Sequence, residues 1–540
     1  MLRRNFIRIS ATAAVIYSKL TYASAAGALV NRPDEAWALL NGNWTKMSAS
    51  GDSTFTFEGV LVELKSQNDV QTVFVECPAA ALEGIRLKWN YKPAAASKIL
   101  GDHWERSYGD LGWLPPAGLR NPWYVLLNDG KKTAGFGVKT GGDTMCWWTM
   151  NPDSLELSMD TLSGGLGVRL RNKQLRAADI ITTISKDNET AYATTTRFCK
   201  MMCDKPLLPK LPVYGINDWY VVYGKNSAET IRTQTAAMAE LVTDTRNRPF
   251  SVIDDGWQIP DDFSKANEKF KDMHMVAEQI KALGMRPGLW TRPLIARKND
   301  RSTILAPPIL GRNNVRMPIL DPTIPENLER ITHNVSLYKE WGYELIKHDY
   351  STYDIYGQWG FKMMGGFTQP GWVYYDQSKT NAEIINQLYQ TISKAAGDMY
   401  VIGCNTMSHL SAGLFAISRI GDDTSGKEWA RTKKMGVNTL AFRLPHHNTF
   451  YAADGDCVGL TRDVPWEKNR QWLQLLAESG SPLFISAEID FLGSDQKAAV
   501  KQAFAQAAKV QPTGEPLDWM ESQWPSKWKL NGRIVDFDWG

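Results

Sequence analysis

The sequence predicts a multidomain protein of the β plus α/β class, an N-terminal β-sandwich followed by a (β/α)8 TIM barrel. The chain has 540 residues, which is long for one domain. Its N-terminal part is a series of short runs rich in β-branched and aromatic residues, which is typical of strands. The remainder alternates apolar strands with periodic helices, the pattern of a βα-repeat fold.

Composition and charge narrow the class of protein. With 43% hydrophobic and 22% charged residues, the chain has the make-up of an ordinary globular protein. Its 61 basic and 58 acidic residues leave a net charge of +3, too balanced to indicate a nucleic-acid or membrane surface. Tryptophan is the outlier at 21 residues; indoles are common platforms for sugars, although many will be core.

The first 25 residues resemble a twin-arginine export signal. Arg3 and Arg4 precede an alanine-rich stretch, and Ala23-Ser24-Ala25 offers a cleavage site. Lys19 interrupts the apolar region, so a short basic amphipathic helix is the alternative. We expect an exported protein, periplasmic or extracellular, and no later segment is long and apolar enough to insert in a membrane.

Six cysteines match no zinc-binding spacing, and we expect mostly free, buried thiols. They are Cys77, Cys146, Cys199, Cys203, Cys404 and Cys457.

Residues 30–205 are predicted to form the β-sandwich, with no long amphipathic helix among the strands. Within them, residues 101–113 (GDHWERSYGDLGW) are unusually polar and aromatic. This stretch is either a loop that reaches a neighbouring active site or a well-packed hairpin. The proline-rich residues 206–212 are predicted to be a linker.

Residues 213–510 are predicted to form the barrel, and 511–540 a short C-terminal extension. Several helices end at a glycine directly before a strand: Gly284, Gly342, Gly397, Gly436 and Gly480. A doubly wound sheet is the alternative, but no G-x-G-x-x-G follows the first strand. The eight strands are expected to begin near Val213, Phe250, Arg286, Tyr343, Tyr400, Phe415, Val437 and Pro482.

The predicted barrel strands end in polar and aromatic residues, and the carboxyl ends of barrel strands are where active sites lie. One carboxylate could be structural, but acidic residues at several strand ends indicate a site. These ends carry Asn217-Asp218-Trp219, Asp254-Asp255-Gly256-Trp257, Trp290 and Arg292, Lys347 and Asp349, Cys404-Asn405, and Arg419 with Asp422-Asp423.

The stretch YELIKHDYST (343–352) places Lys347 and Asp349 on one face of a strand, where the ammonium would keep the carboxylate ionised. A structural ion pair is the alternative. By the same alternation Asp423, not Asp422, shares a face with Arg419. Carboxyls from the fourth and sixth strands could lie ~5 Å apart, as in a retaining glycosidase. Asp349 would be the nucleophile, and Asp423 the acid/base with the higher pKa.

Asp254 and Asp255 would accept hydrogen bonds from sugar hydroxyls, and Trp219 and Trp257 would supply apolar walls. The set NDW, IDDGW, K-x-D and R-x-x-x-D resembles the melibiase-type α-galactosidases, glycoside hydrolase families twenty-seven and thirty-six, over residues 213–490. The resemblance implies Asp349 as nucleophile and Asp423 as acid/base, with Asp254, Asp255, Lys347 and Arg419 binding the glycone. An N-terminal sandwich is more like family thirty-six.

Cys404-Asn405 departs from the family pattern, which usually has C-E-W or a glycine-rich segment facing the 2-position. We count Trp290, Cys404 and Asn405 among the substrate-binding residues. The choice between galactose, N-acetylgalactosamine and arabinopyranose stays open, as does transglycosylation. A non-catalytic sugar-binding protein is a further alternative, against which the presence of both Asp349 and Asp423 argues.

Two weaker candidates remain. Asp454 and Asp456 could hold calcium but are more often a turn, and His446-His447 could rim the pocket. The expected mechanism uses no metal and no cofactor, and the expected partner is a carbohydrate.

Overall fold

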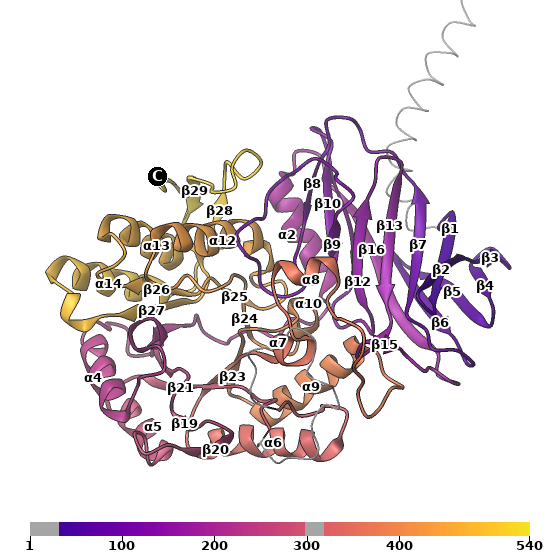
Figure 1. The fold of residues 1–540 in the computed structure, drawn as a ribbon. Coiled ribbons are helices and arrows are strands. Elements are labelled where there is room, and N and C mark those ends of the chain that lie inside the picture. Colours follow the sequence, from indigo (N-terminus) through magenta and orange to yellow (C-terminus); the bar gives the residue numbers. More distant parts are fainter. Residues whose placement is uncertain (1–31, 297–317) are drawn as a thin grey trace, which may run out of the picture.

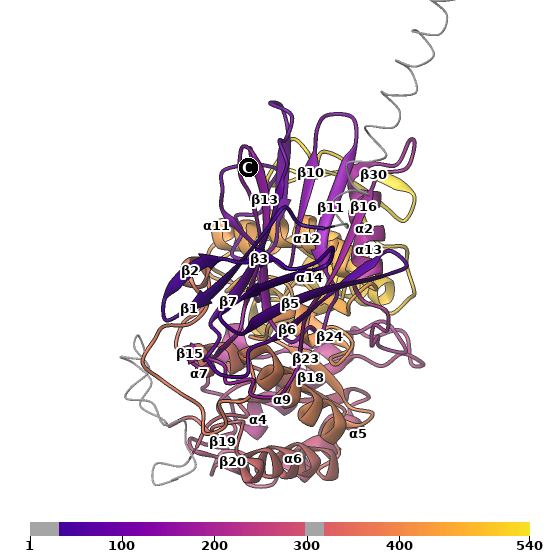
Figure 2. The same cartoon turned by 90° about the vertical axis from the view of Figure 1, so that its right-hand side faces the viewer.

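The computed structural model describes residues 32–296 and 318–540, which form a β-sandwich beside a barrel (Figure 1). Figure 2 turns the sandwich toward the viewer, with the barrel behind and below it. The predicted export signal lies outside the described residues. The predicted fold class, a sandwich followed by a barrel, is confirmed.

Two antiparallel sheets build the sandwich. Alternate side chains such as Val62, Val73 and Leu157 are fully buried between them, as period-two burial requires. One sheet has the order β2 (Asn43–Lys46), β1 (Glu35–Leu40), β7 (Gly84–Asn90), β13 (Ser154–Asp160), β12 (Met145–Met150), β9 (Arg120–Pro122). The other has the order β3 (Ser48–Ala49), β4 (Thr54–Phe57), β5 (Val60–Gln67), β6 (Val70–Glu76), β16 (Leu175–Ile184), β11 (Thr133–Val138), β10 (Tyr124–Asn128), β8 (Lys98–Gly101).

One helix, α2 (Ala191–Met202), lies within the range expected to hold only strands. Thr190 caps it by accepting a hydrogen bond from the Ala193 N–H. Its Phe198 packs directly over Gly135 and Gly137 of β11, where a Cβ atom would lie 2.7 and 2.9 Å from the ring. Glycine in this strand therefore makes room for the helix.

The parallel strands of the second domain form one curled sheet. Its order is β25 (Ala452–Asp454), β24 (Ile417–Arg419), β23 (Tyr400–Gly403), β22 (Leu345–His348), β21 (Arg286–Thr291), β18 (Phe250–Ile253), β17 (Tyr214–Asn217), β27 (Leu483–Ala487), β26 (Cys457–Leu460). The first and last strands in this order, β25 and β26, are separated only by Gly455 and Asp456. The sheet therefore curls back on itself, and β25 and β26 share the seventh position of the barrel.

The seventh strand predicted near Val437 is wrong. Val437 lies in a π-helix, Lys433–Asn438, which continues into α12 (Thr439–Arg443). Gly436 therefore ends no helix; it allows the Trp472 ring to approach, since a Cβ would lie 2.8 Å from it. By contrast Gly284 and Gly342 have φ of +86° and +90°, the left-handed conformation of helix C-termini.

The helices around the barrel bury the apolar stripes expected from their periodicity. Met273, Ala277 and Ile280 are buried in α5, and Ile331, Val335 and Tyr338 in α6. The helices are α3 (Trp219–Val222), α4 (Ala228–Ala239), α5 (Met273–Ala282), α6 (Pro325–Glu340), α7 (Ser351–Tyr356), α8 (Phe361–Gly365), α9 (Asn381–Ala396), α10 (Ser408–Ser411), α11 (Trp429–Thr432), α13 (Trp466–Ser479) and α14 (Ser494–Ala507).

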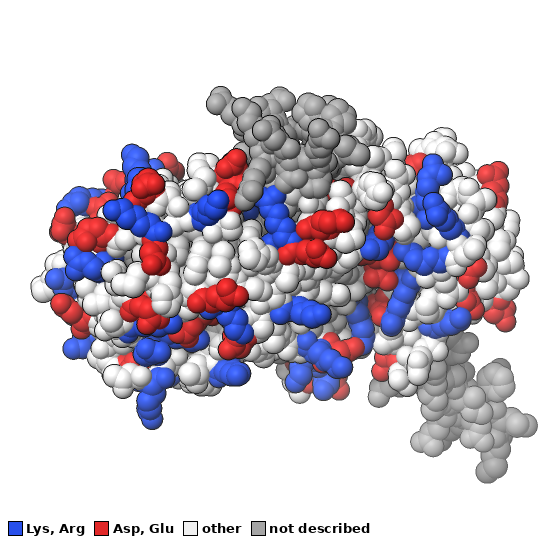
Figure 3. All heavy atoms as spheres, turned by 90° about the horizontal axis from the view of Figure 1, so that it is seen from below, with Lys and Arg blue, Asp and Glu red and all other residues white. Residues whose placement is uncertain are grey.

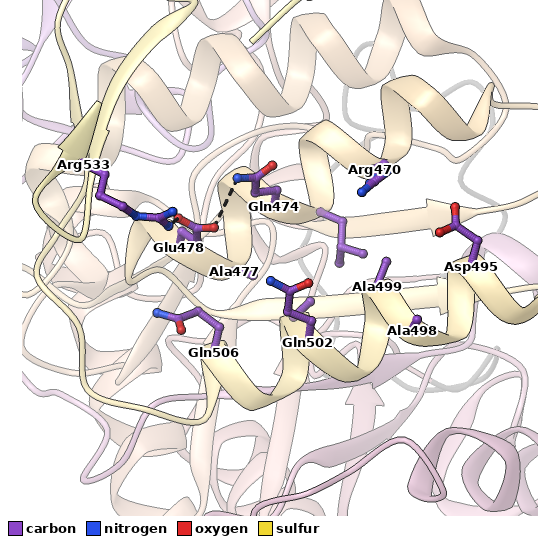
Figure 4. A pocket seen from close by; sticks show the side chains of 12 residues that line it. Arg470, Gln474, Ala477, Glu478, Asp495, Ala498, Ala499, Gln502, Gln506 and Arg533 are labelled. Atoms are coloured by element: carbon purple, nitrogen blue, oxygen red, sulfur yellow. Dashed lines mark hydrogen bonds and ion pairs between the residues drawn. The ribbon is translucent and has the colours of Figure 1, made fainter. Parts of the chain in front are cut away.

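The last residues form a small antiparallel sheet of β28 (Glu515–Pro516), β29 (Lys527–Leu530) and β30 (Arg533–Asp536). It contacts the sandwich, where the Trp519 ring packs edge-on against Trp113. Beside it, α13 and α14 line an outer groove in which Arg533 pairs with Glu478 (Figure 4). None of the site residues predicted from the sequence lines this groove.

On the face seen in Figure 3, acidic and basic side chains are interspersed, in keeping with the balanced net charge. No helix in the described ranges is long and apolar enough to cross a bilayer.

Candidate active site

The polar residues predicted at the strand ends meet at the carboxyl edge of the barrel, around Asp254. The Asp254 carboxylate, after β18, pairs with Lys347 Nζ of β22 at 2.7 Å and accepts a hydrogen bond from Asn217 Nδ2 at 2.7 Å. The backbone N–H of Asp254 donates to Asp218 Oδ1 at 2.7 Å. Three strands are therefore joined at one buried carboxylate.

The structure corrects the predicted partner of Lys347, which pairs with Asp254 rather than with Asp349. Burial alone would lower the pKa of Lys347, but Asp254, Cys404 and Asp349 together raise it well above its usual value. These charges thus favour the ammonium form of Lys347 beside the predicted nucleophile. Asp218, buried behind Asp254, has a pKa raised to about 7 by its burial and by the Asp254 charge.

Asp349 follows β22 and is half-buried. Its Oδ2 accepts a hydrogen bond from Trp290 Nε1 at 3.1 Å, and its Oδ1 accepts one from the Tyr350 N–H at 2.7 Å. Tyr350 has a φ of +64°, so the chain turns sharply here before α7. Both donors to the carboxylate are neutral.

Asp423 follows β24, and two arginines hold it. Its Oδ1 lies 2.9 Å from Arg419 Nη2 and 3.6 Å from Arg106 Nη1, while the side chain remains 39% exposed. Burial would raise the pKa of Asp423, but Arg419, Arg106 and Lys347 lower it to about 2. The raised pKa expected of an acid/base is therefore not a property of this carboxyl in the unliganded protein.

Arg419 is held in place by Asp456, from the break between β25 and β26. Arg419 Nη1 lies 3.0 Å from Asp456 Oδ1, and Asp456 Oδ2 accepts hydrogen bonds from Tyr220 Oη and from the Thr424 N–H. The turn weighed as a calcium site thus orients an arginine instead. Among the described residues, no group of three or more His, Cys, Asp or Glu side chains could hold a metal ion.

Arg106 reaches the same carboxylates from the sandwich, a contact that sequence reasoning did not identify. Its Nη2 lies 2.8 Å from Asp422 Oδ1, and Asp422 also pairs with Arg431 at 2.8 Å. The unusual polarity of residues 101–113 was the only sequence signal. This stretch is both well packed and directed at the site, so the two alternatives were not exclusive.

The remaining predicted residues divide into those at the site and those behind it. Asp255 and Trp219 are half-buried, and Asp255 has a pKa raised by burial and by the charges of Asp254 and Asp349. Trp257 is fully buried; its Nε1 donates to the Trp290 carbonyl at 2.9 Å, so it supports Trp290 and cannot form an apolar wall.

One thiol and one amide, those of Cys404 and Asn405, directly follow strand β23. Cys404 Sγ is buried and lies 3.7 Å from Arg419 Nη1 and 3.9 Å from Arg106 Nη1. Asn405 donates to Glu105 Oε2 through Nδ2 and accepts from the Tyr353 N–H through Oδ1. Asn405 is also fully buried, so it is a link within the protein rather than a group that a sugar can reach. All six cysteines are free and buried.

Two histidines near the barrel strands, His348 and His446, are part of the core. His348 is fully buried against Tyr389 and Phe415, and burial lowers its pKa to about 3. His446 is buried too and lies 2.9 Å from Tyr124 Oη, so it does not rim a pocket.

No protein-family model matches the chain, and no curated protein sequence matches it. Solved structures do. The α-galactosidase TtGalA of Thermus thermophilus superposes with a TM-score of 0.58 at 17% identity, covering 93% of this chain and 99% of that one. The GH36 α-galactosidase AgaA of Geobacillus stearothermophilus gives 0.60 at 13%, covering 93% and 79%.

A GH31 sulfoquinovosidase from E. rectale gives a TM-score of 0.57 at 12% identity, covering 94% of this chain and 87% of that one. At such identities the likeness concerns the fold. The predicted resemblance is confirmed at that level: the chain has the sandwich-and-barrel fold of the GH36 α-galactosidases.

Proposed function

We propose that the protein is a retaining, exo-acting glycoside hydrolase that removes terminal α-galactosyl residues from oligo- or polysaccharides. The observation that carries the proposal is the placement of two carboxylates, Asp349 and Asp423, each held by hydrogen bonds, at the ends of strands that are separated only by β23. Such strands lie ~10 Å apart, so side chains directed into the barrel can approach the ~5 Å separation of a retaining pair.

In this mechanism Asp349 attacks the anomeric carbon while Asp423 donates its proton to the glycosidic oxygen, and the leaving group departs as an alcohol. Asp423 then removes a proton from water, which attacks the β-linked glycosyl-aspartate and releases the sugar with its α-configuration. Asp254, Asp255 and Lys347 bind glycone hydroxyls, and Trp290 holds Asp349 in line for attack. No cofactor takes part.

The solved relatives support the substrate class, since TtGalA was solved with p-nitrophenyl α-galactopyranoside and with stachyose, and AgaA with raffinose. The signal predicted in residues 1–25 would place the enzyme in the periplasm or outside the cell.

The test is hydrolysis of a panel of nitrophenyl glycosides by the wild type, by Asp349→Ala and by Asp187→Ala, whose side chain is 97% exposed. We expect release from the α-galactoside, a loss of at least about 10⁴-fold in kcat for Asp349→Ala alone, and rescue by azide as β-galactosyl azide. Release from a different glycoside only would keep the mechanism and change the proposed sugar specificity. An active Asp349→Ala variant would remove Asp349 from the role of nucleophile.

A further inference from the structure

The segment of the sandwich from Asp102 to Tyr108 is built into the carboxyl edge of the barrel. The Ser107 N–H donates to the Ile420 carbonyl at 2.8 Å, and the Asp422 N–H donates to the Ser107 carbonyl at 3.0 Å. These two bonds extend the sheet directly after β24. At the start of the segment Asp102 forms a buried ion pair of 2.7 Å with Arg443.

The two residues in the middle of this segment, Glu105 and Arg106, reach the ends of two neighbouring barrel strands, β23 and β24. Glu105 is buried and accepts hydrogen bonds from Asn405 after β23 and from the Gly360 N–H after α7. Arg106 spans the adjacent carboxylates Asp422 and Asp423 with its two terminal nitrogens. A planar guanidinium is suited to this bridging, because it presents its donors in a fixed fork.

Arg106 is an unfavourable residue to bury for stability alone. Its side chain is only 6% exposed, and its Nε has no hydrogen-bond partner in the part of the chain that the structure describes. Buried ion pairs are often no more stabilising than apolar residues of similar volume, and an unpaired buried donor adds a cost. This favours a functional reason for the residue.

The contacts of Asp423 leave one oxygen available for chemistry. Both arginines approach Oδ1, and no hydrogen bond from the described residues reaches Oδ2. A proton transferred by Asp423 would therefore travel on Oδ2, whose direction the Oδ1 contacts fix. The other groups whose charges interact with this carboxyl are Lys347 of β22 and the phenols of Tyr220, Tyr223 and Tyr350. Arg431 donates to the backbone carbonyl of Asp423 and pairs with Asp422.

We propose that Arg106 is a positioning residue: the N-terminal sandwich uses it to fix Asp422 and Asp423, so that Asp423 Oδ2 is aimed at the glycosidic oxygen. The inference rests on the proposed function of Asp423 as acid/base. It makes the sandwich a component of the active site, and the barrel alone an incomplete one.

The experiment compares Arg106→Met and Arg106→Lys with the wild type on α-galactosides with nitrophenol and with sugar leaving groups. For Arg106→Met we expect kcat to fall about 10–100-fold with a sugar leaving group and much less with nitrophenol, which departs without a proton. The alkaline limb of kcat/KM moves to higher pH, because loss of the cation raises the pKa of Asp423. Arg106→Lys keeps the positive charge but not the two-pronged geometry of the guanidinium. The alkaline limb of kcat/KM should therefore stay at the same pH, while kcat with a sugar leaving group still falls.

A matched control is Arg86→Met, which removes a sandwich arginine whose partners, Glu156, Ser158 and Trp44, belong to the sandwich as well. This variant should have the same kcat as the wild type with both kinds of leaving group, and the same pH profile of kcat/KM. If Arg106→Met lowered kcat equally for both leaving groups and left the alkaline limb of kcat/KM at the same pH, Arg106 would be a structural residue only.

A second measurement needs no substrate and separates this inference from the proposed function. Carboxyl ¹³C NMR follows the titration of Asp423 directly, with its resonance identified by its loss in Asp423→Asn. We expect its pKa to rise in Arg106→Met and not in Arg86→Met; an unchanged titration would overturn the proposal. A wild type inactive on every glycoside would instead contradict the proposed function while leaving the titration result to stand.

Discussion

Asp349 and Asp423 lie at the same edge of the barrel, after β22 and β24, but the groups that hold the two carboxylates differ in charge. Asp349 is held by two neutral N–H donors, from Trp290 and Tyr350. Asp423 is held by two guanidinium groups, from Arg419 and Arg106. Charge alone would assign the more stable anion to Asp423, which is the reverse of what an acid/base requires.

In the proposed mechanism Asp423 therefore takes up its proton only when a sugar is bound. Burial is the largest single influence on its pKa, and it acts upward. A sugar that covers the 39% of the side chain now exposed strengthens this influence and favours the protonated form. In the proposed mechanism the arginines then orient Asp423, whereas the two neutral N–H donors orient Asp349 for attack on carbon.

After Asp349→Ala, the largest expected effect comes from Asp423→Ala, and the product formed with azide distinguishes the roles of the two carboxylates. We expect kcat to fall about 10²–10⁴-fold with sugar leaving groups and far less with nitrophenol. Azide should rescue this variant as α-galactosyl azide, because it attacks the β-linked glycosyl-Asp349 intermediate. The Asp349→Ala variant should give the β-anomer, by direct displacement. If the two variants exchanged their anomers, the roles of the two carboxylates would be reversed.

A smaller effect is expected for Trp290→Phe, which removes one of the neutral donors to Asp349. A hydrogen bond to a charged group is worth about 1.5–3 kcal/mol, so kcat/KM should fall about 10–100-fold. Trp148→Phe is the control: it loses a similar bond, from Nε1 to the Trp123 carbonyl at 3.2 Å, inside the sandwich. Equal kcat/KM values for the two variants would show that the neutral donor does not matter to the nucleophile.

Sequence reasoning reached the strand ends but not all the contacts between them. Alternation along a strand correctly separated Lys347 from His348, and the four-residue step from Arg419 to Asp423 correctly predicted their contact. It wrongly gave Lys347 the partner Asp349 instead of Asp254, because which strand ends meet in space is decided by the whole barrel. Arg106 lies more than 200 residues before the carboxylates it contacts, and one sequence carries no record of such a contact.

The fold was predicted where the local signal was strong. The predicted helix ends at Gly284 and Gly342 are real, and both glycines have a left-handed φ. The helix end predicted at Gly436 is not, because that glycine is needed for close packing against Trp472. The seventh strand position is divided between β25 and β26, which have only three and four residues. Neither is an extended apolar run of the kind that predicts a buried strand. Trp257, predicted to face a sugar, instead fills the space between helix and strand.

The smallest effect is expected on the opposite face of β22, where His348 lies between Lys347 and Asp349, the two residues proposed to act on the sugar. Its ring nitrogens have no hydrogen-bond partner among the described residues, and burial lowers its pKa to about 3 from 6.5. Between these values the unfolded chain binds a proton that the folded protein does not, so stability is present above pH 6.5 and is lost as the pH falls toward 3.

His348→Leu should therefore leave kcat/KM at pH 7 unchanged and flatten this dependence. Between pH 7 and 5.5 the wild type should lose ~1 kcal/mol more unfolding free energy than the variant, measured by denaturant titration at each pH. The other buried histidines titrate alike in both proteins, so the difference isolates His348. Parallel stability curves would mean that His348 has the same pKa in the folded protein as in the unfolded chain. A fall in kcat/KM would mean that the two faces of the strand are not independent.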